Sequence, residues 1–246
     1  MTVGLGIDIG GTGIKGAPVD IDVGDLVADR YRIDTPKKSR PHEVVKVVEQ
    51  VVAHFPDVQG PIGLTFPGVV IGGVVHTAAN VDKTWIDFDA DKFFGEQLGR
   101  PVTMMNDADA AGVAEMNFGA GKDKKGVVIM ITLGTGIGCA LFHDGVLLPN
   151  TELGHIEIDG KDAELLASGS ARDNERLPWK DYAKRVQRYL RRLDALVWPD
   201  LVILGGGVSK EAEKFLADVK VRVPVVTAEL LNNAGIVGAA TLAAGR

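Results

Sequence analysis

The first residues of the chain that could do chemistry stand together in one short turn after an apolar run. They are Asp8, Gly10, Gly11, Thr12, Gly13 and Lys15. Glycine lets a ligand approach the main chain closely, so the N–H groups of such a turn can surround an anion. A P-loop would need a helix after its lysine, whereas Lys15 stands in a second apolar, β-rich run. The pattern therefore predicts a phosphate-binding hairpin.

Asp8 is the unusual member of this turn. A carboxylate beside a bound phosphate would be repelled unless a cation lies between them. Asp8 is therefore a candidate for positioning Mg²⁺, directly or through its waters. The alternative is an ordinary glycine-rich hairpin with a surface aspartate.

A second candidate site follows a predicted strand over residues 101–105, where Asn106 and Asp107 open a helix. A carboxylate at the carboxyl end of a strand faces the region in which α/β proteins bind ligands. Asp107 is thus a candidate general base, with Asn106 holding a substrate hydroxyl, as phosphoryl transfer to an alcohol requires. The competing interpretation is that Asp107 or Asp109 only caps the helix.

Two more glycine turns occur in the second half of the chain. They consist of Gly134, Thr135 and Gly136, and of Gly205, Gly206 and Gly207. A helix predicted over residues 210–216 follows the last turn, and its amino terminus would add partial positive charge. Both turns are candidate phosphate sites, although glycine also serves close packing.

Polar residues near the middle of the chain are candidates for binding a sugar. Glu152 and His155 flank Gly154 on a predicted turn, so both side chains could bind vicinal hydroxyls through charge-assisted hydrogen bonds. The alternative is that they are surface residues.

A predicted helix over residues 179–198 has one strongly basic face, with almost no compensating acid before Asp194. We name as a candidate polyanion track Lys184, Arg185, Arg188, Arg192 and Lys210, with Lys122, Lys124, Lys125 and Lys214 as candidate extensions. A solvated helix face is the ordinary explanation of such a run.

The composition limits the class of protein. The 246 residues carry a net charge of −6, which argues against a general nucleic-acid binder. A single cysteine, Cys139, excludes an internal disulfide and a multi-cysteine zinc site and suits a reducing compartment. We see no secretory signal, and the apolar run 126–142 is too short to span a membrane. We therefore expect a cytoplasmic protein that binds no nucleic acid and no membrane.

The elements that position these residues follow from hydrophobic periodicity and turn signals. A helix begins near Pro41 and another at Asp107. We expect strands over residues 3–9, 14–21, 26–33, 61–67, 101–105, 127–133, 139–142, 146–148, 201–204 and 221–226, and further helices over 91–98, 179–198, 210–216 and 236–244.

The second half of the chain repeats the plan of the first, with strand, glycine turn and strand at the start of each half. We therefore predict an α/β protein with two similar lobes and a central cleft. Residues 1–108 would form a small lobe, completed by 232–246, and residues 109–231 a larger one.

Taken in order, the motifs resemble those of the ROK family of sugar kinases. The resemblance rests on Asp8-Ile9-Gly10-Gly11-Thr12 with Lys15, Asn106-Asp107-Ala108, Leu133–Gly138, Glu152-Leu153-Gly154-His155 and Gly205-Gly206-Gly207-Val208. It implies an actin-like ATPase (ribonuclease H-like) fold. It also implies Asp107 as catalytic base and Asn80, Asn106, Asp107, Glu152, His155 and Glu164 as glucose contacts. The cysteines that bind structural zinc in many members are missing, so no zinc site is expected.

Within this family the opening and closing segments most resemble the members that use inorganic polyphosphate. The resemblance implies transfer of the terminal phosphoryl group of polyphosphate, and in many relatives also of ATP, to the 6-hydroxyl of glucose, with Mg²⁺ and commonly as a homodimer.

Three alternatives stay open. A strictly ATP-dependent hexose kinase would share every catalytic feature. A sugar-sensing repressor would need a DNA-binding segment ahead of the strand at Val3. An actin-like or chaperone-like ATPase would lack the cluster of Glu152 and His155.

Overall fold

The computed structural model describes residues 1–78 and 81–245 and divides the chain into two compact units. The first unit combines residues 1–118 with 233–246, and the second contains 119–232. The division falls after Phe118 rather than after residue 108, because helix α3 (Asp107–Phe118) packs on α7 (Ala234–Ala243) of the first unit. The first unit is consequently the larger one, whereas the sequence suggested the reverse.

The first unit is built on a sheet in the order β3-β2-β1-β5-β9, with β4 also paired to β2. Strands β1, β5 and β9 are parallel, and β2 runs antiparallel to β1. The strands are β1 (Val3–Ile9), β2 (Gly13–Asp20), β3 (Asp25–Leu26), β4 (Tyr31–Asp34), β5 (Ile62–Phe66) and β9 (Val102–Asn106), with a small separate sheet of β6 (Val70–Ile71), β7 (Val74–Val75) and β8 (Phe88–Asp89). The remaining elements are α1 (Pro41–His54), α2 (Ala90–Leu98) and the short 3₁₀ helix η1 (Lys83–Trp85).

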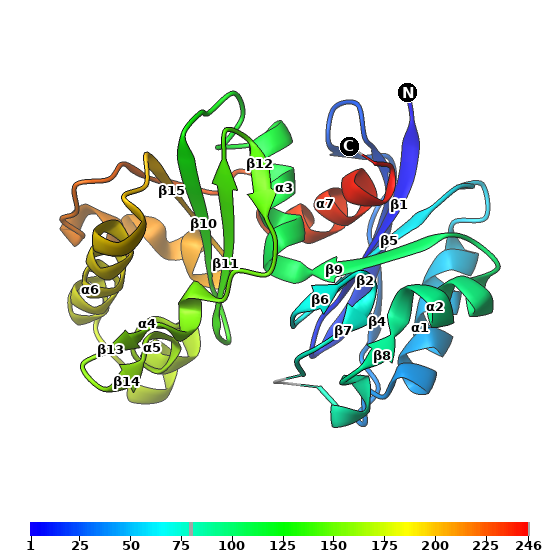
Figure 1. Cartoon of the computed structure of the whole chain (residues 1–246), viewed down its shortest axis with the longest axis horizontal. Helices are drawn as coiled ribbons and strands as arrows, with labels where there is room; N and C mark the ends of the chain where they lie inside the picture. Colours follow the sequence, from blue (N-terminus) through cyan, green and yellow to red (C-terminus); the bar gives the residue numbers. More distant parts are fainter. Residues whose placement is uncertain (79–80, 246) are drawn as a thin grey trace. The chain divides into compact units, whose positions relative to one another are not determined.

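Helices cover both faces of this sheet, with α7 on one face and α1 and α2 on the other (Figure 1). Side chains alternate along a strand, so Leu5 and Ile7 of β1 enter the core that includes α1, while Gly6 faces α7. A Cβ at Gly6 would lie 1.9 Å from the carbonyl oxygen of Ile236. Glycine at this position therefore lets the backbone of α7 approach the strand.

The single strand predicted over residues 26–33 is wrong, because the structure has two short strands there. Two short strands, β3 and β4, pair with different parts of β2, so the chain leaves the sheet between them. This break contains the charged pair Asp29 and Arg30, both exposed, which a half-buried strand disfavours.

The second unit repeats the sheet order of the first, as β12-β11-β10-β15-β16. Its first three strands in sequence are antiparallel neighbours, and β15 and β16 then run parallel to β10. This confirms the predicted duplication. The strands are β10 (Val127–Leu133), β11 (Ile137–His143), β12 (Val146–Leu148), β15 (Leu201–Gly205) and β16 (Val225–Thr227), with a separate hairpin of β13 (Glu157–Ile158) and β14 (Lys161–Asp162).

Helix α6 (Trp179–Val197) supplies the core of the second unit. Tyr182, Val186, Tyr189 and Leu193 recur at helical spacing and pack with β10 and β15, including Ile131. The other helical elements are α4 (Ala163–Ala167), α5 (Gly169–Glu175) and the 3₁₀ helices η2 (Leu153–His155), η3 (Gly207–Lys214), η4 (Leu216–Asp218) and η5 (Leu231–Asn233).

The α-helix predicted over residues 210–216 is wrong. The segment is the 3₁₀ helix η3, interrupted at Glu211, whose φ of −107° and ψ of 16° are not helical. Such a short, irregular segment has few aligned peptide dipoles, so the predicted electrostatic contribution of a helix amino terminus is lost.

None of the helices across residues 1–78 and 81–245 combines the length and apolar character of a membrane span.

Candidate active site

The predicted phosphate hairpin joins β1 to β2, and Asp8 stands near the end of β1 with two polar partners. Its Oδ2 lies 3.0 Å from Nζ of Lys15, the residue opposite it on β2. Its Oδ1 accepts a 2.6 Å hydrogen bond from Oγ1 of Thr65, the residue beside it on β5. The sequence analysis expected a cation next to Asp8, and the side chain of Lys15 is such a cation.

This pairing also tests how Mg²⁺ fits. Both oxygens of Asp8 already have a polar partner, Lys15 at Oδ2 and Thr65 at Oδ1. In the described residues no group of three or more His, Cys, Asp or Glu side chains is arranged to hold a metal ion. The residues fit a cation brought by a phosphate donor and contacted by Asp8 through water, rather than a metal cage made by the protein.

The turn itself is held by side chains from β4 and its end. Oγ1 of Thr35 donates to the carbonyl oxygen of Gly10 at 2.5 Å, and Nη2 of Arg32 donates to that of Thr12 at 2.9 Å. No other atom lies within 4 Å of the position that a Cβ at Gly11 would occupy, so this part of the turn is open. None of the three glycines of this turn has a positive φ, so their use is close approach and not left-handed backbone.

Asn106 and Asp107 lie where β9 passes into α3, at the edge of the sheet where β1 and β5 also end. Oδ1 of Asn106 accepts from the N–H groups of Ala108 and Asp109 at 2.8 and 3.0 Å, so Asn106 caps the helix. The sequence analysis had named Asp107 or Asp109, and not Asn106, as the residue that could cap this helix. Nδ2 of Asn106 also donates to the carbonyl oxygen of Gly68 at 3.1 Å, and an amide nitrogen carries two N–H donors.

The Asp107 side chain is half-buried, and its Oδ1 also accepts from the N–H of Ala108 at 2.8 Å. This hydrogen bond from the first turn of the helix orients the carboxylate. This geometry fits the predicted general base.

In the second unit Glu152 and His155 gather with an acid that the sequence analysis missed, Asp162. Nδ1 of His155 lies 2.8 Å from Oδ2 of Asp162, and Nε2 lies 3.9 Å from Oε2 of Glu152. The hydrogen bond to Asp162 raises the pKa of His155, and neighbouring carboxylates add to this rise while partial burial opposes it. Burial raises the pKa of Glu152, opposed by His155 and assisted by Glu164.

Glu164 connects this cluster to the second glycine turn. Its Oε2 accepts a 2.9 Å hydrogen bond from the N–H of Ile137 at the start of β11. A Cβ at Gly136 would lie only 2.1 Å from the same oxygen, so glycine is needed for the carboxylate to reach the hairpin. A Cβ at Gly154 would likewise lie 2.1 Å from the carbonyl oxygen of Ile137, so η2 also approaches the hairpin through a glycine.

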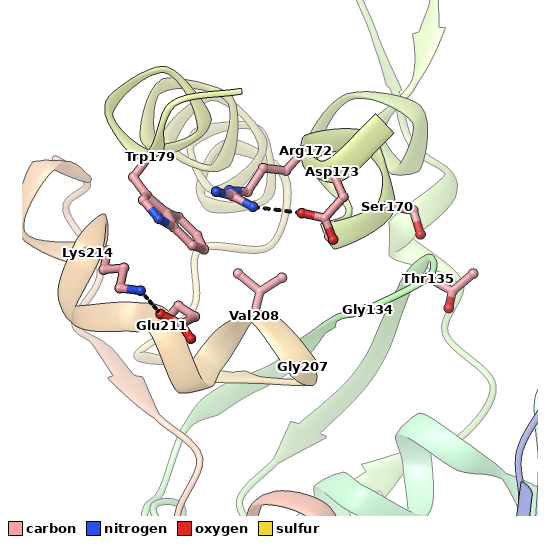
Figure 2. Close-up of a pocket in the computed structure, with 11 residues that line it drawn as sticks. Gly134, Thr135, Ser170, Arg172, Asp173, Trp179, Gly207, Val208, Glu211 and Lys214 are labelled. Atoms are coloured by element: carbon pink, nitrogen blue, oxygen red, sulfur yellow. Dashed lines mark hydrogen bonds and ion pairs between the residues drawn. The ribbon is translucent and has the colours of Figure 1, made fainter. Parts of the chain in front are cut away.

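The other side of this turn borders a cavity of about 530 Å³ (Figure 2). Gly134, Thr135 and Gly207 line it, so the structure brings two of the predicted phosphate turns together. The rest of the wall comes from α5, the start of α6 and η3: Gly169, Ser170, Arg172, Asp173, Trp179, Val208, Glu211 and Lys214.

The three glycines of the last turn have different surroundings. Gly207 has open space where a Cβ would be, whereas Gly205 packs on Met130 and Gly206 on the backbone of Leu133. Gly206 also has a φ of 80°, which an L side chain rarely adopts. Gly207 borders the cavity, while Gly205 and Gly206 shape the turn.

The predicted polyanion track is largely neutralised, contrary to the expectation of uncompensated charge. Lys184 pairs with Asp181 at 2.7 Å, Arg185 with Glu175 at 2.9 Å, and Arg188 with Asp159. Glu175 and Asp159 lie outside α6, so the sequence of the helix alone could not reveal them. Arg192 and Lys210 have no ion pair within residues 1–78 and 81–245.

Asn80, a predicted glucose contact, lies outside the described residues.

Several residues at these sites were missed by sequence reasoning. Asp162 had one signal, its position two residues before Glu164 at the cap of α4. Thr65 could have been placed opposite Asp8 by aligning the parallel strands. Arg172 and Trp179 had no local signal, because they enter the cavity through the packing of α5 against α6.

The duplicated sheet order and the glycine turn after the first strand of each unit define the fold as that of the actin-like ATPases. The chain belongs to the ROK family, whose profile matches residues 4–174.

Individual relatives agree with this assignment. The chain is 50% identical over 238 residues to a polyphosphate glucokinase of Mycobacterium tuberculosis, a match that covers 96% of this chain and 89% of the relative. It is 50% identical to an inorganic polyphosphate/ATP-glucomannokinase from Arthrobacter sp. strain KM of known crystal structure, with a TM-score of 0.95 over 99% of both chains. It is 25% identical to a ROK family glucokinase from Streptomyces griseus, solved with glucose and AMPPNP, with a TM-score of 0.84 over 99% of this chain and 100% of that one.

Proposed function

We propose that this chain is a polyphosphate glucokinase. It transfers the terminal phosphoryl group of inorganic polyphosphate, and also of ATP, to the 6-hydroxyl of glucose. The activities in the names of the relatives from M. tuberculosis and Arthrobacter, each 50% identical over nearly the whole chain, support this function.

One structural observation carries the proposal. The β10–β11 turn borders the cavity through Gly134 and Thr135, and it binds Glu164 through the N–H of Ile137. A phosphoryl donor in the cavity and a sugar at the carboxylate cluster would therefore be held by the same turn. Phosphoryl transfer needs this proximity, because it relies on positioning and electrostatic stabilisation rather than on covalent chemistry by the protein.

Each candidate residue then has a role. Glu152, His155 and Glu164 bind glucose hydroxyls, and the hydrogen bond to Asp162 fixes the orientation of the His155 ring. Asn106 contributes the second N–H of its amide, and Asn80 is retained as a further contact from the family resemblance. Asp107 acts as the catalytic base and accepts the proton of the attacking hydroxyl.

Main-chain N–H groups of the glycine turns, together with Lys15, would bind the donor phosphates, and Mg²⁺ would accompany the donor. When bound, Mg²⁺ would supply positive charge to the transferring phosphoryl group. Asp8 would contact it through water, and the hydrogen bond from Thr65 keeps the Asp8 carboxylate oriented. A longer polyphosphate chain would continue along Arg192 and Lys210, where no acid of the described part of the chain neutralises the charge.

The test is the production of glucose 6-phosphate with polyphosphate and with ATP as separate donors. We expect the wild type to use both. Asp107→Asn should abolish turnover with both donors while glucose still binds, because the amide keeps the shape but cannot accept a proton. Turnover with ATP alone would establish the strictly ATP-dependent alternative.

The proposal includes a cytoplasmic location and a homodimeric assembly. A reducing compartment is consistent with the single cysteine, which is buried and unbridged. Sedimentation of the purified chain would test the assembly.

A further inference from the structure

The wall of the cavity opposite the glycine turns contains one aromatic ring, Trp179, and the guanidinium of Arg172 covers it. The Cζ atom of Arg172 lies 3.6 Å from the centre of the indole ring, and Phe215 stacks nearly parallel to that ring at 5.6 Å between ring centres. Figure 2 shows Arg172 and Trp179 side by side on this wall.

The two phosphoryl donors differ in the chemical groups that could contact Trp179 and Arg172. A nucleoside triphosphate carries a planar base, which would stack on an exposed indole face. A guanidinium 3.6 Å above the ring centre already occupies that stacking position. Polyphosphate carries no base and offers only charged oxygens, which a guanidinium binds well.

The polar groups of Arg172 are only partly satisfied. Nη1 donates to Oδ1 of Asp173 at 2.7 Å, and this acid is the adjacent residue, with a side chain that is 73% exposed. Nε is buried and has no hydrogen-bond partner among the described residues. A buried donor without a partner is rare in a folded protein, so the guanidinium keeps unused hydrogen-bonding capacity, and its one acid partner is an exposed surface residue.

The second cation of the cavity does not compete for this role. Nζ of Lys214 lies 5.7 Å from the centre of the Trp179 ring and pairs with Glu211 one turn away on η3. Arg172 is thus the cation that covers the aromatic surface.

We propose that Arg172 is a specificity-determining residue that favours polyphosphate over a nucleoside triphosphate, an inference that rests on the proposed function. It excludes a base from the face of Trp179 and presents a cation to the phosphate chain instead. ATP binds productively when the guanidinium leaves the ring.

The experiment compares kcat/KM for polyphosphate and for ATP at saturating glucose. We expect Arg172→Ala to lower kcat/KM for polyphosphate about tenfold, equivalent to ~1.4 kcal/mol, and to leave that for ATP unchanged or higher. Arg172→Lys should retain more polyphosphate activity than Arg172→Ala. Asp173→Asn should raise polyphosphate activity, because it removes the acid from the guanidinium. Lys180→Ala, an exposed cation beside Trp179 outside the cavity wall, is the matched control and should leave the donor ratio unchanged.

The salt dependence of kcat/KM for polyphosphate gives a second measurement that a purely structural role would not affect. It should weaken in Arg172→Ala, since one screened contact is gone. An equal loss with both donors, or an unchanged donor ratio in all Arg172 variants, would overturn the inference while leaving the proposed function intact. A wild type that makes no glucose 6-phosphate from polyphosphate would refute both.

Discussion

Glycine at position 136 should be required for glucose binding because of the carboxylate beside it. In Gly136→Ala the new Cβ would lie 2.1 Å from Oε2 of Glu164, too close for any real contact. The obstructing atom is the end of a flexible side chain, so Glu164 should move and the protein should still fold. The movement breaks its 2.9 Å hydrogen bond to the N–H of Ile137.

The size of the effect follows from that bond. A hydrogen bond to a charged group contributes about 1.5–3 kcal/mol. Ile137 is buried, so its N–H would be left without an acceptor once Glu164 moves. We expect the free energy of unfolding to fall by about 1.5–3 kcal/mol. If Glu164 also binds glucose, the Kd for glucose should rise about tenfold to hundredfold, since each factor of ten is ~1.4 kcal/mol.

The assay is a glucose titration without donor, by calorimetry, together with urea unfolding. Gly134→Ala is the control, because no other atom lies within 4 Å of its Cβ position. It should keep the glucose affinity and stability of the wild type. Wild-type glucose affinity in Gly136→Ala, or an equal loss in Gly134→Ala, would refute the assignment of Glu164 to the sugar.

Three further predictions concern other parts of the site. Thr65→Val should lower the free energy of unfolding by about 1.5–3 kcal/mol in urea titrations, because fully buried Thr65 donates a 2.6 Å hydrogen bond to Asp8; an unchanged midpoint would contradict this. The pKa of His155 is raised, chiefly by its hydrogen bond to Asp162, so its stabilising contribution should be complete at low pH and fade as the pH rises through that pKa. As the pH rises from about 6 to about 8, the free energy of unfolding should therefore fall more steeply in the wild type than in His155→Gln. Parallel curves for the two proteins would show that the pair of His155 and Asp162 does not stabilise the fold. Arg192→Glu should reduce kcat/KM for polyphosphate at low salt but not that for ATP, and an equal reduction with both donors would remove Arg192 from the track.

The sequence predicted the architecture because its signals are local. Apolar runs bounded by turn signals placed most of the strands, although the strand predicted over residues 221–226 forms only over Val225–Thr227, and two glycine turns at matching positions revealed the duplicated sheet. Asp107 could be named as a candidate because a carboxylate between a strand and a helix is recognisable from neighbouring residues alone. The irregular segment η3 escaped, since a few residues after a glycine turn carry too little periodicity to separate a 3₁₀ helix from an α-helix.

By itself, then, the sequence determined the fold, the family and the residues that stand at the ends of the strands. Tertiary structure decided the partners of those residues: Lys15 at Asp8, Asp162 at His155, and Asp159 at Arg188. It also placed Arg172 over Trp179, which no spacing in the chain predicts. Strand and turn signals act over a few neighbouring residues, whereas ion pairs and stacked rings depend on ångström-scale packing between elements that the chain brings together only when it folds.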